Sequence, residues 1–179
     1  PLPGKTILIS PQQLQQLKAI KGIRNFSLVL EEKAILQSGD ERSVISLKGV
    51  DGNYRYTTGV ADHLVNGKYD LGTEEQPKLI VGAGVENSLR IMADRHVLPM
   101  QIYLPRKSNT EQINQLDDIS TDTIYSSAAF MIQQDFDNKY AITNIDFEKQ
   151  QMGLAANEYS ALKLKLKPTP DIKKKKKKL

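Results

Sequence analysis

Residues 78–91, Lys-Leu-Ile-Val-Gly-Ala-Gly-Val-Glu-Asn-Ser-Leu-Arg-Ile, combine a short apolar run, two glycines and a helical pattern near the middle of the chain. The apolar run 79–81 ends at Gly82, and Gly84 follows two residues later. Apolar residues then recur at a spacing that suits one face of a helix: Val85, Leu89 and Met92. The segment therefore predicts a strand, a tight glycine turn and a helix that begins near Val85.

The glycine turn has two competing interpretations, a loop that cradles a phosphate and a structural corner. A dinucleotide fingerprint requires a third glycine at the position that Asn87 occupies here, and no parallel βαβ unit is expected to follow. The Gly-Lys-Ser/Thr of a P-loop is absent as well. The structural interpretation is favoured, in which the glycines let a helix pack closely against a strand. It predicts that Gly82→Val damages folding and that no phosphate binds there.

Residues before this segment predict a β-α-β-β order. Residues 5–9 form a strand, Ser10 is a good N-cap, and Pro11 suits the first helical position because its missing N–H is not needed there. The helix runs to Lys21, with Gly22 as its C′ residue. A strand or a bent pair of strands, a hairpin turn and a further strand follow: 23–36, 37–40 and 44–50.

The C-terminal part repeats the pattern of strand, polar cap, helix and strand. Residues 140–143 predict a strand, and Asn144 can cap a helix over 145–154. Leucine and lysine then alternate through 159–167, which is typical of an antiparallel strand with leucines toward a core and lysines toward water. Asp171 can cap a last helix. The two chain ends thus form a weak internal repeat of roughly thirty residues.

The middle of the chain has a different character, with short β segments and polar loops: strands at 100–104 and 123–134, a loop at 106–118 and a turn at 135–139. The predicted fold class is α+β. Two β-α-β halves, 1–56 and 139–179, form one subdomain, and 57–138 form an inserted β-rich subdomain.

Composition excludes several classes of function. The chain has 179 residues, 39% of them hydrophobic and 26% charged, and no window of about 18 consecutive apolar residues. The net charge of +4 includes six positive charges from Lys173 to Lys178, so the other residues carry −2. Without a basic body or interleaved aromatic residues, nucleic-acid binding is not expected. With no cysteine, disulfides and thiolate chemistry are excluded. The abrupt ends predict a fragment of a longer protein.

No arrangement of residues predicts catalysis. His63 and His96 lack a second metal ligand at a suitable spacing. The aspartate pairs 117/118 and 135/137 lack the spacing of a calcium loop and are interpreted as turn residues. Glu31 and Glu32 are neighbours on a strand, so they point to opposite faces and cannot share an acid/base role. We therefore predict no enzyme, no catalytic, cofactor-binding or metal-binding residue, and no cofactor.

A series of short motifs resembles one family, the MacB-like periplasmic core domain of ABC-transporter permeases of the LolC, LolE, MacB and FtsX type. The match covers essentially the whole chain and depends on the order and spacing of the motifs: Leu47-Lys48-Gly49-Val50-Asp51-Gly52-Asn53-Tyr54, Thr58-Gly59-Val60, Asn66-Gly67-Lys68-Tyr69, Ile80-Val81-Gly82 and Tyr159-Ser160-Ala161-Leu162. A glycine that members often carry before Asp94 is absent, and no chaperone-recruiting hook loop is evident.

The resemblance implies a porter-like subdomain from the chain ends and a sabre-like subdomain from the insertion. It implies a domain on the periplasmic side of the bacterial inner membrane, between two transmembrane helices. Its partners would be the rest of its permease, a cytoplasmic ATP-binding subunit, a second permease subunit, and a lipoprotein or other periplasmic protein. Lipoprotein release is the function that the resemblance favours.

MacB-like efflux, FtsX-like regulation and a free-standing periplasmic ligand-binding module are the alternatives to lipoprotein release. An enzyme would need activity that depends on His63 or Asp94. Any substrate contacts are expected at exposed apolar residues of the insertion and in the cleft between the subdomains.

Overall fold

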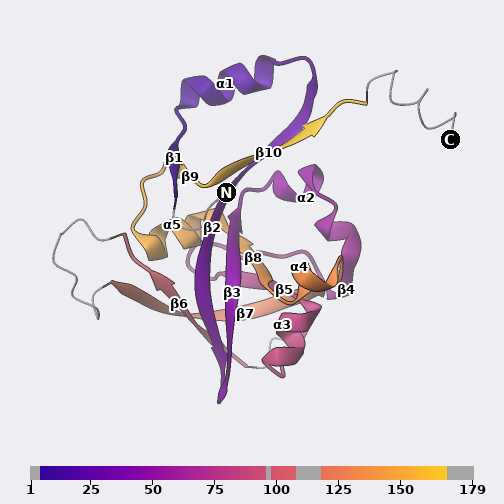
Figure 1. The fold of residues 1–179 in the computed structure, drawn as a ribbon, viewed down its shortest axis with the longest axis vertical. Helices are drawn as coiled ribbons and strands as arrows, with labels where there is room; N and C mark the ends of the chain where they lie inside the picture. Colours follow the sequence, from indigo (N-terminus) through magenta and orange to yellow (C-terminus); the bar gives the residue numbers. More distant parts are fainter. Residues whose placement is uncertain (1–4, 96–97, 108–117, 169–179) are drawn as a thin grey trace, which may run out of the picture.

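A computed structural model describes residues 5–95, 98–107 and 118–168. Its main element is a mixed eight-stranded sheet (Figure 1), in the order β10 (Ala161–Leu166), β2 (Ile23–Ser38), β3 (Glu41–Val50), β8 (Tyr140–Asn144), β5 (Lys78–Gly82), β7 (Ile119–Phe130) and β4 (Leu64–Gly67), with β6 (Met100–Pro105) paired to β2 and β7. A small second sheet pairs β1 (Ile7–Leu8) with β9 (Glu158–Tyr159). The helical elements are α1 (Pro11–Ala19), α2 (Tyr54–Thr57), the 3₁₀ turn η1 (Val60–His63), α3 (Ala83–Ser88), α4 (Gln134–Asp137) and α5 (Ile145–Met152).

The first helix begins as the sequence predicts and ends differently. Ser10 accepts a hydrogen bond from the Gln13 amide, and the Gln13 side chain accepts one from the Ser10 amide, which completes a capping box. The helix ends at Ala19, and Ile20 leaves it in an extended conformation. The prediction of Gly22 as a left-handed C′ residue is therefore wrong. No residue of α1 is fully buried; the helix lies at the top of Figure 1, and Leu14 packs against the apolar cluster that includes Leu28 and Leu30 of β2.

The predicted hairpin is confirmed and is longer than expected. Strands β2 and β3 pair in antiparallel register from Val29–Val50 to Ser38–Glu41. Gly39, at φ +57°, occupies the left-handed conformation that the two-residue turn requires. Strand β2 also pairs with β10 and β6. It extends through most of the length of the molecule (Figure 1).

The C-terminal cap and helix are confirmed as well. Asn144 accepts a hydrogen bond from the Phe147 amide at the start of α5, and Gly153, at φ +67°, ends the helix. Strand β10 is antiparallel to β2, but its leucines do not all face a core. Leu162 is half-buried against a cluster of apolar side chains, whereas Leu164 and Leu166 lie beyond that cluster and are 47% and 66% exposed. The predicted helix at Asp171 lies outside the described residues.

The glycine corner has the predicted strand-turn-helix order. Gly82 is the N-cap of α3, so the helix starts at Ala83, two residues before the predicted Val85. Val85 and Leu89 are buried, but Met92 is 60% exposed and does not share their face. Helix α3 ends before Met92, because the chain turns at Arg90, whose φ is +51°.

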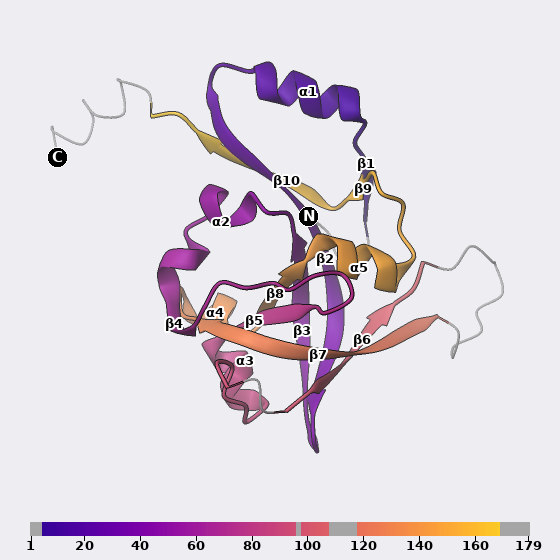
Figure 2. The same ribbon diagram turned by 180° about the vertical axis from the view of Figure 1, so that it is seen from behind.

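The corner is structural because α4 packs directly against its glycines. A Cβ on Gly82 would overlap the backbone of Asp137, and a Cβ on Gly84 would overlap Asn138. No simple βαβ unit follows the corner, as expected: the strand after α3 is β6, which is antiparallel to β7, and β5 pairs in parallel with β7 only across this longer connection. Parallel pairing was not predicted because the long connection is not a simple βαβ unit. Strand β7 pairs with β6 along its first half and with β4 at its C-terminal end (Figure 2).

Strands from the middle of the chain and from its ends share one sheet and one core. Strand β5 pairs with β8 as well as with β7, and β2 pairs with β6. The main core combines the following side chains, among others, from both parts of the chain: Leu36, Leu47, Val81, Ile102, Ile124 and Phe147. A mixed α and β fold is confirmed. The division into 1–56 with 139–179 and an inserted 57–138 stays a prediction.

Candidate functional site

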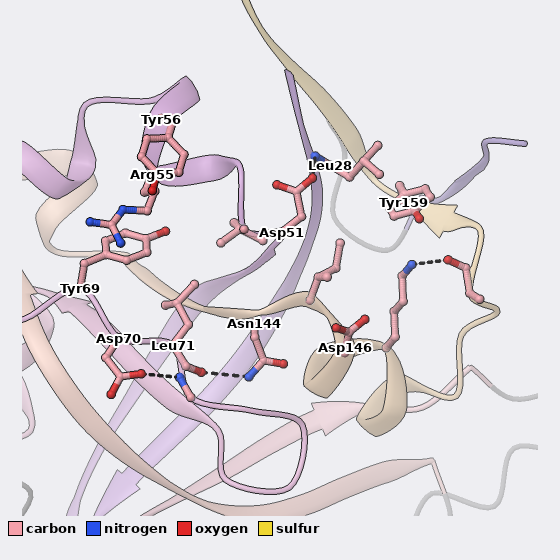
Figure 3. A pocket seen from close by; sticks show the side chains of 16 residues that line it. Leu28, Asp51, Arg55, Tyr56, Tyr69, Asp70, Leu71, Asn144, Asp146 and Tyr159 are labelled. Atoms are coloured by element: carbon pink, nitrogen blue, oxygen red, sulfur yellow. Dashed lines mark hydrogen bonds between the residues drawn. The ribbon is translucent and has the colours of Figure 1, made fainter. Parts of the chain in front are cut away.

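A groove of about 630 Å³ is the candidate site, and we call it the polar groove (Figure 3). It lies between the turn after β3, the segment 69–72, the N-terminal half of α5 and β9. It is thus lined by residues from both chain ends and from the middle segment, where the sequence predicts a cleft. Its principal polar and aromatic side chains are Asp51, Arg55, Tyr56, Tyr69, Asp70, Asn144, Asp146, Lys149 and Tyr159.

Asp51, the aspartate of the Lys-Gly-Val-Asp motif, holds one wall in place. Its carboxylate accepts hydrogen bonds from the Ser27 hydroxyl at 2.6 Å and from the Leu28 amide at 2.9 Å. It also accepts one from the Asn53 amide at 3.1 Å, just before α2 begins. Asp51 therefore ties the β2–β3 pair to the turn that leads into α2, which is a positioning role.

Asn144 holds the opposite wall. Besides capping α5, it donates from its side-chain nitrogen to the Leu71 and Thr73 carbonyls, each at 2.9 Å. Asp70 accepts from the Gly72 amide at 2.9 Å and pairs with Lys78 at 2.5 Å. The loop at 70–73 is thereby attached to the start of α5, and the groove keeps its shape through hydrogen bonds on both sides.

Cations and tyrosines face each other within the groove. The Arg55 guanidinium lies 5.1 Å from the ring centre of Tyr69, and the Lys149 ammonium lies 3.8 Å from that of Tyr159. Burial lowers the pKa of Lys149, and burial raises the pKa of Tyr69. The Tyr69 hydroxyl is buried and has no hydrogen-bond partner among the described residues.

The groove offers recognition and no evident reaction chemistry. The described residues that line it include three aspartates, one arginine and one lysine, and no histidine, serine or cysteine. Asp146 and Arg55 are exposed, so a ligand could reach a negative and a positive group along one groove. Such an arrangement suits a ligand of mixed polarity, bound by hydrogen bonds and by contact with tyrosine rings.

The residues considered for catalysis or metal binding do not come together. His63 ends η1 with an exposed side chain, and its carbonyl accepts from the Met131 amide at 2.9 Å. Asp94 is exposed, and His96 and Asp117 lie outside the described residues. Across 5–95, 98–107 and 118–168, no three histidine or acidic side chains are grouped so that they could hold a metal ion.

The predicted turn aspartates have structural contacts where they are described. Asp137 accepts a hydrogen bond from the Ile132 amide at 2.8 Å, and the Asp118 carbonyl accepts from the Arg106 amide at 2.7 Å. Asp118 directly precedes β7, whereas Asp137 is the last residue of α4, so the turn predicted at 135–139 is a short helix followed by a turn. Within the described ranges, no helix is long and apolar enough to span a bilayer.

Glu31 and Glu32 have separate surroundings, and a third glutamate was missed. Glu31 accepts from the Tyr140 hydroxyl at 3.2 Å and lies 3.5 Å from the Lys48 ammonium. Glu148, on α5, is fully buried; burial, together with the charges of Glu32 and Glu31, raises its pKa well above the ordinary value. Its position, three residues after Ile145 and four before Met152, could have indicated a buried helix face.

Comparison with solved structures finds the same fold in extracytoplasmic domains of transporters. The chain is similar to the extracellular domain of the noncanonic ABC-type transporter YknZ from Gram-positive bacteria, with a TM-score of 0.60 and 12% identity over 93% of this chain and 78% of that one. The chain has the fold of an extracytoplasmic permease domain. The resemblance inferred from the sequence is thereby confirmed at the level of the fold.

Two further structures have this permease-domain fold. The periplasmic region of MacB from Actinobacillus actinomycetemcomitans has a TM-score of 0.55 and 10% identity, over 95% of this chain and 72% of that one. A domain of a permease protein from Porphyromonas gingivalis has a TM-score of 0.52 and 12% identity, over 87% of this chain and 62% of that one. No family model matches the sequence, and no curated protein matches it either.

Proposed function

We propose that this chain is the extracytoplasmic domain of an ABC-type transporter permease. The observation that carries the proposal is the fold shared with the YknZ and MacB domains over 93% and 95% of the chain. The permease would sit in the bacterial inner membrane, with this domain on the outer side. ATP would be hydrolysed by a separate cytoplasmic subunit, and we expect no enzymatic activity in the domain itself.

Strand β2 gives the domain a means to transmit movement. It contains 16 residues, which at about 3.3 Å each extend over roughly 50 Å. It is hydrogen-bonded to β10 near its start and to β3 and β6 further along. Because three neighbours hold it, a displacement at the β10 end would move the tip near Gly39 as part of a rigid body. Such stiffness suits a domain that couples events in the membrane to a substrate outside it.

Partners and substrate follow from this role. The flanking transmembrane helices, a second permease subunit and the ATP-binding subunit would complete the transporter. Lipoprotein release is the function that the sequence resemblance favours, and efflux and FtsX-like regulation are the alternatives. Deleting the gene separates them: lipoproteins retained in the inner membrane would support release, increased drug sensitivity would support efflux, and a cell-division defect would support regulation.

The location can be tested with single cysteines, because the chain has none. Asp40→Cys at the exposed hairpin turn should react with a membrane-impermeant maleimide in spheroplasts that express the full-length gene. Ala129→Cys, at a fully buried position, is the matched control and should stay unlabelled. Labelling of Asp40→Cys only after lysis would contradict the proposal, as would a full-length gene without apolar segments of about twenty residues beside this region.

A second candidate function is a free-standing ligand-binding module, which the polar groove favours. A soluble full-length protein whose melting temperature rises with a small metabolite would support it. Arg55→Ala and Asp146→Ala should then abolish the rise without changing the melting temperature of the free protein, since both side chains are exposed. A rise that persists in both variants would place the ligand elsewhere.

A further inference from the structure

The basic residues of the described chain are concentrated at one end. Segments 5–25 and 159–168, which we call the basic end, are held together by the β1–β9 and β2–β10 pairs and form the top of Figure 1. They contain seven basic residues and no acidic one: Lys5, Lys18, Lys21, Arg24, Lys163, Lys165 and Lys167. The other described residues contain 12 basic and 18 acidic side chains. The nearest acid in sequence, Glu158, is buried and bound to Lys107.

Large aliphatic side chains are exposed at the same end. They come from β1, from the residue that ends α1 and from β10, and between 47% and 66% of each is exposed: Ile7, Leu8, Ile20, Leu164 and Leu166. A shallow apolar groove connects the first three of them along α1, past Leu17. An exposed cluster of this kind usually contacts another surface.

We infer that the basic end rests on an anionic lipid surface. Aliphatic side chains would enter the boundary between head groups and acyl chains, and the lysines beside them would bind anionic head groups. A protein partner fits less well, since lysine is depleted in the buried centre of protein interfaces, whereas here the exposed Ile20 lies between the exposed Lys18 and Lys21 at the end of α1. The inference rests on the proposed function, which places a bilayer beside the domain.

This placement fixes the orientation of the domain. The tip of the β2–β3 hairpin lies at the opposite end from α1 and β10 (Figure 1). With the basic end on the membrane, the hairpin would point away from it, and β2 would lead from the lipid surface to the outermost part of the domain. The polar groove would open beside the membrane-proximal half, because Leu28 and Tyr159 line it.

Sedimentation with vesicles tests the inference directly. The purified chain would carry Lys173 to Lys178 replaced by glutamine, so that the lysine run cannot dominate binding. It should sediment with phosphatidylglycerol-containing vesicles, release at high salt, and stay in solution with phosphatidylcholine alone. Reversing three exposed cations of the basic end should weaken binding at least about tenfold: Lys18→Glu, Lys21→Glu and Lys167→Glu. The matched control reverses three exposed cations elsewhere and should change binding less than about twofold: Lys68→Glu, Arg95→Glu and Lys139→Glu.

Three results would overturn the inference. They are loss of vesicle binding on replacing the lysine run alone, equal losses in the two triple variants, and undiminished binding to pure phosphatidylcholine. If the triple variant of the basic end melts early, Leu164→Ser with Leu166→Ser tests the same surface through its exposed leucines. If vesicle binding fails but Asp40→Cys is labelled from outside, only the lipid inference is contradicted and the proposed function stands. If the chain binds vesicles but Asp40→Cys is not labelled from outside, the permease proposal is contradicted and the lipid-binding surface is still supported.

Discussion

Gly49 of β3 and Glu148 of α5 are in direct contact, with no space between them for another carbon atom. A Cβ built on Gly49 would lie 3.0 Å from the Glu148 Cβ and 3.1 Å from the Ile145 Cα. Helix α5 can therefore lie close on β3 only because residue 49 has no side chain. The glycine of the Lys-Gly-Val-Asp motif has this physical role, and it brings a carboxyl group into the core.

Gly49→Ala should lower the free energy of unfolding by about 1–3 kcal/mol, because the added methyl pushes α5 from the sheet. Gly52→Ala is the matched control, since a Cβ there meets nothing within 4 Å, and its effect should stay within about 0.5 kcal/mol. Urea unfolding at neutral pH measures both variants. Equal losses in the two would refute close packing at Gly49 as the cause.

Glu148 should make the protein less stable as pH rises. Burial raises the pKa of Glu148, so the folded state retains a proton that the unfolded state releases above its ordinary value of 4.5. The stabilising contribution is complete below that pH and is lost as pH increases through the raised pKa. Neither carboxylate oxygen has a hydrogen-bond partner of normal geometry among the described residues, although the nearby Gly49 amide acts in the opposite direction on the pKa.

Glu148→Gln cannot ionise and should therefore gain stability relative to the wild type as the pH rises above 4.5. The measurement is the difference in urea unfolding free energy at several pH values, which cancels the other titrating groups. A difference that stays constant with pH would show that Glu148 titrates normally.

Glu158 should show the opposite behaviour. Hydrogen bonds from Lys107, the Ala155 amide and Thr6 lower the pKa of Glu158 to about 2. The ionised form is favoured in the folded state, so its contribution is present above pH 4.5 and is lost as pH falls toward 2. Glu158→Gln should destabilise the protein at pH 7 and match the wild type near pH 2. A variant whose deficit is the same at both pH values would contradict the shift.

Two substitutions separate the roles of Asn144. Asn144→Asp keeps the oxygen that caps α5 but loses the two bonds donated to Leu71 and Thr73, whereas Asn144→Ala loses both functions. Ala should cost about 1 kcal/mol more than Asp in thermal or urea unfolding, which is the usual value of an N-cap. Hydrogen exchange at 70–73 should increase in both variants. Unchanged exchange in Asn144→Asp would show that these bonds do not hold the loop.

Gly82→Val should prevent normal folding, and Gly82→Ala should cost at least about 2 kcal/mol, because any Cβ there overlaps the Asp137 backbone. Gly59→Ala is the control, with free space around the added Cβ. Thermal unfolding and soluble yield measure the effect. A stable, soluble Gly82→Val protein would reject the structural corner, and phosphate protection of the wild type would restore the phosphate-binding hypothesis.

The sequence alone determined the local elements of this protein. The caps at Ser10 and Asn144 and the hairpin turn at Gly39 depend on residues within a few positions of one another. Short-range hydrogen bonds and the conformational freedom of glycine are enough to specify them. The order of the motifs also indicated the fold that the solved structures confirm.

Only the tertiary structure decided which surfaces are covered. Alternation along β10 predicted buried leucines, yet Leu164 and Leu166 extend past the core, and the parallel β5–β7 pair arises across a long connection. The polar groove joins residues as distant as Leu28 and Tyr159, and Glu148 is buried against Gly49, roughly a hundred residues away in sequence. Burial is set by the chain segments that pack together in space, and a periodic pattern shows which side chains share a face but not what covers that face.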